Sequence, residues 1–164
     1  MRPMHVLIAL FTACLLVLAP ASAQDYPEID WLELMPEDEV RALEEMQNVI
    51  DHSGDAPQSE VMSDRTVPEM DGREGKIVGY IVPLSVSETN EILEFFLVPY
   101  FGACIHVPPP PPNQLIHVKA DEPIPMVNIW DPYWVEGSVH VRTIENSMAK
   151  ASYTMEPVRV VPYE

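Results

Sequence analysis

The sequence has few basic residues and few glycines. Its 164 residues include nine lysines and arginines against 26 aspartates and glutamates, which gives a formal net charge of −17. A surface that binds phosphate groups needs clustered Lys and Arg side chains, and the basic residues of this chain are scattered. With six glycines, a glycine-rich phosphate-binding loop is not expected either. We therefore expect no nucleic acid among its partners.

Long apolar runs are also scarce. One apolar stretch, 6–19, is shorter than the roughly 20 residues that span a bilayer. Arg2 before it and the small residues 21–23 after it are typical of a secretory signal peptide. We expect cleavage after Ala23, a periplasmic location and no integral membrane segment in the mature chain. An uncleaved membrane anchor is the alternative.

Cysteine occurs twice, at Cys14 and Cys104. Cys14 does not fit a lipidation site, because Phe11 stands where a small aliphatic residue is expected. Removal of the signal peptide would take Cys14 away, so Cys104 has no disulfide partner within the mature chain. A lone thiol outside the cytoplasm is a redox hazard, which suggests that Cys104 has a function.

The mature chain has the length of one domain. Its sequence pattern changes once, from helical spacing to the alternation typical of strands. Residues 36–50 have apolar side chains at helical spacing, begin with a proline and carry acidic residues in the first turn, which predicts an amphipathic helix. The following polar stretch lacks a steady period and is typical of a surface linker. The predicted organisation is a signal peptide at 1–23, a lead-in at 24–35, the helix at 36–50, the linker at 51–74 and a β domain at 75–164.

Five short strands are predicted within the β domain. They are rich in β-branched and aromatic residues and cover 76–84, 93–100, 114–120, 137–145 and 151–161. Gly79 within the first and Gly137 at the start of the fourth stand where the coiled strands of a small barrel bend. We expect a mostly β fold with one N-terminal helix (α+β), built as a small OB-like five-stranded antiparallel barrel. A half-open β-sandwich is the alternative.

Histidines beside Cys104 suggest a metal site. If residues 104–106 are extended, Cys104 and His106 share one face, and strand alternation places His117 and His140 on the accessible face of their strands. Thiolate and imidazole are ligands for zinc or Cu(I), so Cys104, His106 and His117 are the candidate ligands. Asp131 or His140 could complete the set. The alternative is that Cys104 is a small buried side chain and His106 a hydrogen-bonded turn residue.

Five consecutive prolines follow this motif. Such a run adopts a stiff polyproline II rod, which either spaces the motif from the next strand or presents a docking surface to another protein. The candidate partner-binding residues are Pro108, Pro109, Pro110, Pro111, Pro112 and Asn113. Nearby aromatic residues could pack against the prolines: Tyr100, Phe101, Trp130, Tyr133 and Trp134. A stiff loop packed on its own barrel is the alternative.

Two segments carry a resemblance to a known family. DWLELMPEDEVRALEEM at 30–46 and FFLVPYFGACIHVPPPPPNQLIHV at 95–118 resemble the DUF3299 family of exported bacterial proteins and lipoproteins, over about 30–163. The resemblance implies a periplasmic accessory protein, often found with ABC-type permeases and linked in some members to metal homeostasis. Cys104, His106 and the segment Pro108–Asn113 match the family hallmark. No catalytic set is implied, and this chain lacks the lipobox cysteine of the lipoprotein members.

Two functions follow as hypotheses. The first is an exported accessory protein that binds Zn(II) or another soft metal for an ABC-type transport system. The second is an adaptor that binds a membrane transporter complex through the proline segment without a metal. We expect no enzymatic activity, because the sequence contains none of the common hydrolase, nucleotide-binding or metalloprotease motifs. A thiol nucleophile at Cys104 with a histidine base is the remaining enzymatic option.

Overall fold

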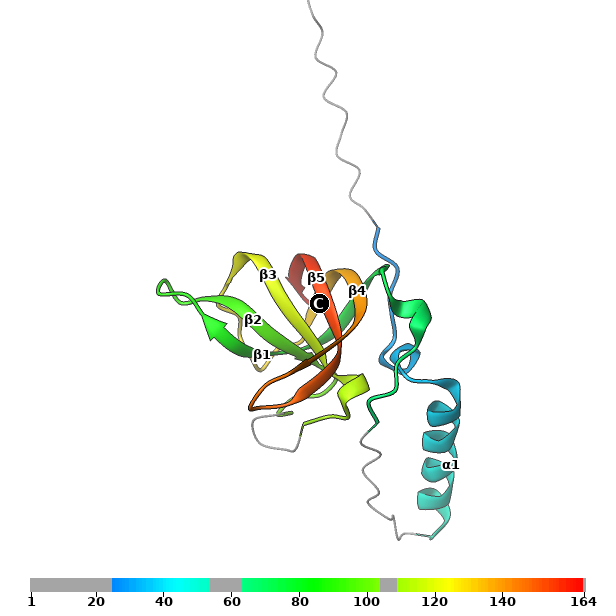
Figure 1. Cartoon of the computed structure of the whole chain (residues 1–164). Helices are drawn as coiled ribbons and strands as arrows, with labels where there is room; N and C mark the ends of the chain where they lie inside the picture. The colour runs from blue at the N-terminus through cyan, green and yellow to red at the C-terminus, as the bar shows by residue number, and fades with distance from the viewer. Residues whose placement is uncertain (1–24, 54–62, 104–108, 164) are drawn as a thin grey trace, which may run out of the picture.

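The computed structural model describes residues 25–53, 63–103 and 109–163. They form a β-barrel with one α-helix beside it (Figure 1). Five strands close the barrel in the order β1-β2-β3-β5-β4, which confirms the predicted fold class and excludes the half-open sandwich. The strands are β1 (Arg73–Val86), β2 (Glu91–Val98), β3 (Ile116–Pro125), β4 (Tyr133–Glu145) and β5 (Lys150–Pro162). The helix α1 is Glu37–Ser53, and three short 3₁₀ helices are η1 (Trp31–Leu34), η2 (Pro68–Met70) and η3 (Pro112–Gln114).

The strand pairing explains how the barrel closes. The predicted antiparallel pairing holds for β1–β2, β2–β3, β1–β4 and β4–β5. The pair β3–β5 is parallel, with Ile116 opposite Tyr153 and Val118 opposite Met155. A parallel pair joins strands that are distant along the chain, and here it closes the five-stranded Greek-key barrel that OB folds share.

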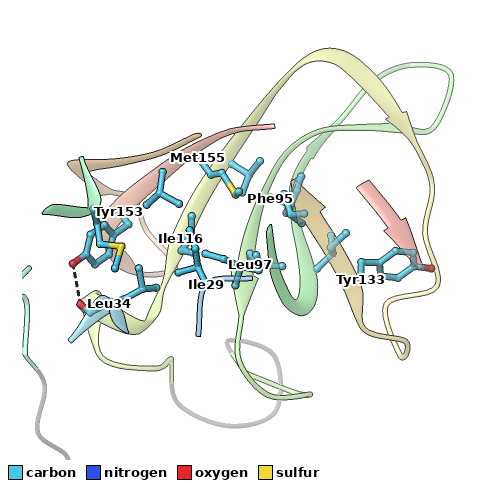
Figure 2. Close-up of a cluster of buried hydrophobic side chains, with 14 of the residues drawn as sticks. Ile29, Leu34, Phe95, Leu97, Ile116, Tyr133, Tyr153 and Met155 are labelled. Atoms are coloured by element: carbon cyan, nitrogen blue, oxygen red, sulfur yellow. Dashed lines mark hydrogen bonds between the residues drawn. The ribbon is translucent and has the colours of Figure 1, made fainter. Parts of the chain in front are cut away.

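Alternate residues of the strands fill the barrel interior (Figure 2). Phe95 and Tyr133 lie toward one end, and Tyr153 lies at the other end beside Leu34 of η1. The strands are twisted and coiled, so the interior is a packed core in which side chains from all five strands meet. This arrangement leaves the other half of each strand's residues facing outward.

The two glycines predicted to bend the strands lie at close backbone approaches. At Gly79, β1 changes partner from β4 to β2, and a Cβ atom would lie 2.7 Å from the carbonyl oxygen of Val98. Gly137 lies inside β4 and not at its start, because the strand begins four residues earlier. There the register with β5 shifts, and a Cβ atom would collide with the carbonyl oxygen of Glu156. Both positions therefore require glycine on steric grounds.

The segment before the helix contributes to the core. Ile29 and Leu34 are buried in it, and residue Glu28 forms a bridge to Lys76 of β1. The hydroxyl of Tyr153 donates a hydrogen bond to the carbonyl oxygen of Leu34 at 2.9 Å (Figure 2). The lead-in predicted at 24–35 is therefore a structural part of the barrel.

Regular elements occupy both ends of the predicted linker at 51–74. Helix α1 continues to Ser53, and β1 already begins at Arg73. In the described part of this segment Met70 is buried in the core, and the backbone N–H of Val67 donates to the hydroxyl of Tyr153 at 2.7 Å. Val67 is the N-cap of η2, and Met70 is its last residue. A 3₁₀ helix of three residues is too short to show a recognisable periodicity in the sequence.

Candidate functional site

A second apolar cluster covers part of the outer wall of the barrel. Its buried members from the strands are Val82, Phe96, Val98 and Ala151, with Leu115 just before β3. Ala103, which immediately precedes Cys104, is buried in the same cluster. The chain after β2 therefore returns over the outer wall, and the residue before the predicted metal ligand is fixed there.

The described part of the proline run packs on the protein itself. Pro110 and Pro112 are buried, and Pro109 and Pro111 are partly buried. Asn113, at the end of the run, has no exposed surface. These residues therefore leave little free surface for a partner in this conformation. Pro108 lies outside the described residues, and partner binding by this segment stays a prediction.

Asn113 belongs to a buried polar network that the sequence did not predict. Its Nδ2 donates to Oε2 of Glu39 in α1 at 2.8 Å and to the carbonyl oxygen of Arg65 at 3.0 Å. Ser63 Oγ donates to the other Glu39 oxygen at 2.6 Å, and the N–H of Asn113 donates to the Ser63 carbonyl oxygen at 3.2 Å. The network joins the helix, residues 63–65 and the end of the proline run.

His117 lies on the outer face of β3, as predicted, but it is less accessible than expected. Its side chain is 12% exposed, and its ring meets the Phe96 ring edge to face at 5.9 Å. Its Nε2 lies 4.0 Å from a carboxylate oxygen of Glu94. Burial lowers the pKa of His117 below its ordinary value of 6.5, the Glu94 carboxylate raises it, and Lys119 lowers it further. Burial therefore favours the neutral imidazole.

The two residues proposed to complete the metal set are not beside His117. Thr154 of β5 lies between His117 and His140, because it pairs with both. Neighbouring strands are about 4.8 Å apart, so the two histidines are separated by about 10 Å. His140 instead lies between two carboxylates, with Nδ1 3.6 Å from Asp71 and Nε2 3.8 Å from Glu156.

Asp131 lies in the β3–β4 connection, where its carboxylate accepts a hydrogen bond from Asn128 Nδ2 at 2.7 Å. Among the residues that the structure describes, no three His, Cys, Asp or Glu side chains are grouped to hold a metal ion. Cys104 and His106 lie outside the described residues. The predicted set of Cys104, His106 and His117 therefore stays a prediction.

Aromatic side chains form an exposed cluster next to the loop that follows β2. Phe101 and Trp130 stack with ring centroids 4.7 Å apart, and Phe101 meets Tyr80 edge to face at 5.9 Å. Trp130 is 61% exposed. Of the other aromatic residues considered, Tyr133 is in the core and Trp134 packs against Tyr163 and Lys76. Phe101 and Trp130 come from separate loops, so their stacking was not readable from the sequence.

Comparison with known proteins identifies the family. The model of the family described as "Protein of unknown function (DUF3299)" matches residues 31–162. This chain belongs to the DUF3299 family. It is similar to the crystal structure of a DUF3299 family protein from Pseudomonas aeruginosa PAO1, with 38% sequence identity and a TM-score of 0.66. That match covers 84% of this chain and 97% of the other. No curated protein matches the chain.

The DUF3299 description attaches no catalytic activity to the family. The expected absence of enzymatic activity is compatible with that description and stays a prediction. In the parts of the chain that the structure describes, no helix has the length and apolar composition required to cross a membrane.

Proposed function

We propose that this DUF3299 protein is an exported accessory protein that binds zinc or another soft metal through Cys104, His106 and His117. The observation that carries the proposal is the state of His117. A metal ligand must be a neutral imidazole, and burial lowers the pKa of His117 below 6.5, which favours that form. Protons would then compete less with a metal ion at His117 than at an ordinary histidine.

The position of His117 gives further support. It stands on the outer face of β3 beside β2, and in OB folds the faces of these two strands commonly bind ligands. Within this chain, His117 touches Phe96, which shares its apolar cluster with Ala103, the neighbour of Cys104.

Titration of the reduced, metal-free protein with Zn(II) by calorimetry tests the proposal. We expect tight one-to-one binding, abolished by Cys104→Ser and weakened by about 100-fold in His117→Ala, because loss of a ligand leaves an incomplete set. His140→Ala is the matched control, since it removes an outer-face imidazole two strands away. No heat with the wild-type chain, or unchanged binding by Cys104→Ser, would refute the proposal.

Export and association with an ABC-type transport system complete the proposed function. The support is the predicted signal peptide at 1–23 and the resemblance described above. Fractionation of producing cells should place the chain in the periplasm with its N-terminus at Gln24. Recovery of the chain in the cytoplasm, with residues 1–23 retained, would contradict this part of the proposal.

The exposed aromatic cluster favours a second candidate function, an adaptor that binds a membrane transporter complex without a metal. Stacked aromatic side chains that remain exposed are typical of interaction surfaces. Under this hypothesis, Trp130→Ala lowers co-purification with the permease about ten-fold even in the presence of a chelator. Val158→Ala, which trims another exposed apolar side chain, is the control. Loss of co-purification in Cys104→Ser, with Trp130→Ala unaffected, would contradict the adaptor hypothesis.

A further inference from the structure

A groove lies where the start of α1 meets residues 66–70. It has a volume of about 700 Å³. Its apolar lining includes the side chains of Leu32, Val40 and Val67, with the buried Met35 and Met70. Leu32 is 48% exposed there, although it follows directly on a residue packed against the core. The floor of the groove therefore presents apolar surface to solvent.

The rim of this groove is acidic. Glu33, Glu37, Glu44 and Glu69 line it, and Arg41 is the single basic residue among its lining residues. Glu33 is neutralised by Arg73 at 2.7 Å. Among the described residues, no cation lies within salt-bridge distance of the other three carboxylates. These three carboxylates outnumber Arg41, so the rim carries net negative charge that would attract a cation.

Helix α1 extends the groove into solvent. The helix stands beside the barrel, and its attachment is at its N-terminal end (Figure 1). Val40 and Leu43 are only partly buried, so this part of the helix keeps some apolar surface in contact with solvent. A partner that lies along this side would bury apolar surface that folding alone leaves in water.

From these observations we infer that the groove binds a basic amphipathic segment of another protein. Its aliphatic side chains would enter the groove, and its Lys or Arg residues would meet Glu37, Glu44 and Glu69. A second copy of this chain is a poor occupant, because a net charge of −17 on each copy opposes association. Charge complementarity therefore points to a basic partner.

The test uses a fluorescein-labelled, 14-residue peptide of Lys and Leu with leucines at helical spacing. Binding to the full chain is followed by fluorescence anisotropy with EDTA present, so the result does not depend on the proposed metal. We expect saturable binding that weakens with salt. Glu37→Gln and Glu44→Gln should each weaken it roughly two- to five-fold, the loss expected for one exposed ion pair. Leu32→Ser should weaken it by a similar factor through loss of apolar contact.

Controls separate the groove from the general acidity of the chain. Glu88→Gln and Glu122→Gln remove exposed carboxylates elsewhere on the barrel and should leave the affinity unchanged. A peptide with Glu in place of Lys should not bind. Equal weakening by all four Glu→Gln variants, or binding of the acidic peptide, would overturn the inference. So would dimers in sedimentation experiments that disappear in Leu32→Ser, because the occupant would then be a second copy.

Discussion

Phe95 and Phe96 are neighbours in β2, and both are completely buried, but they lie on opposite sides of the barrel wall. Phe95 packs in the interior among residues of all the strands. Phe96 packs outside, in the cluster that includes Ala103 of the following loop. The strands themselves enclose the interior cluster. The outer cluster is covered in part by the loop that follows β2. The candidate ligand His117 belongs to the outer wall.

The largest expected effect comes from truncating the two phenylalanines separately. Phe95→Ala should lower the free energy of unfolding by about 3–5 kcal/mol, because it leaves a cavity that the barrel cannot close. Phe96→Ala should cost about 3 kcal/mol or less, since the outer cluster has fewer buried side chains than the interior one and can collapse more easily around the smaller side chain. Urea denaturation measures both. An equal cost for both variants would show that the outer cluster is as rigid as the core.

Asn113 tests how strongly the outer wall is tied to the helix. Asn113→Ala removes the donor that Glu39 Oε2 and the Arg65 carbonyl oxygen share, so it should cost about 2–3 kcal/mol of the free energy of unfolding. Denaturant unfolding, followed by circular dichroism, measures this cost. A double-mutant cycle with Glu39→Gln should give a coupling energy of about 1 kcal/mol or more. Additive costs would contradict a direct contribution from this contact.

Tyr153 provides the matching test for the inner wall. Tyr153→Phe keeps the ring but leaves the Val67 N–H and the Leu34 carbonyl oxygen without their shared hydroxyl. We expect a loss of about 1–2 kcal/mol in the free energy of unfolding, measured from thermal and urea transitions. Tyr26→Phe, which changes a buried tyrosine outside the interior cluster, is a control of the same chemistry. Similar losses for both variants would argue against a specific role of the Tyr153 hydrogen bonds.

The smallest expected effect is the pH dependence due to His117. Its pKa is lower in the folded chain than the ordinary 6.5, so the unfolded chain binds more protons as the pH falls below about 6.5. The contribution of His117 therefore destabilises the fold on acidification and is absent above that pH. In His117→Gln the free energy of unfolding should therefore fall less between pH 7 and pH 5 than in the wild type. Identical pH profiles for wild type and His117→Gln would contradict the assigned cause.

Local sequence patterns predicted most of the fold, but they did not predict the packing on the outer wall of the barrel. Alternation of apolar residues and the glycines at 79 and 137 predicted a small barrel. Alternation also placed His117 outside, but it could not show that the loop would cover that face. The uninterrupted apolar run at 95–98 was a signal that both faces of β2 are buried. The contact between Glu39 and Asn113 joins residues 74 positions apart, and no local pattern predicts such a pair.

The parallel pairing of β3 with β5 has a consequence for the order in which the protein can assemble. Strand β5 is the last in the sequence, and it fills the space between β3 and β4. Until those last residues are available, both neighbours have unpaired backbone edges and the interior is open to water. Strand β5 must therefore be in place before the barrel can close, and removal of residues 150–162 would leave the interior open between β3 and β4.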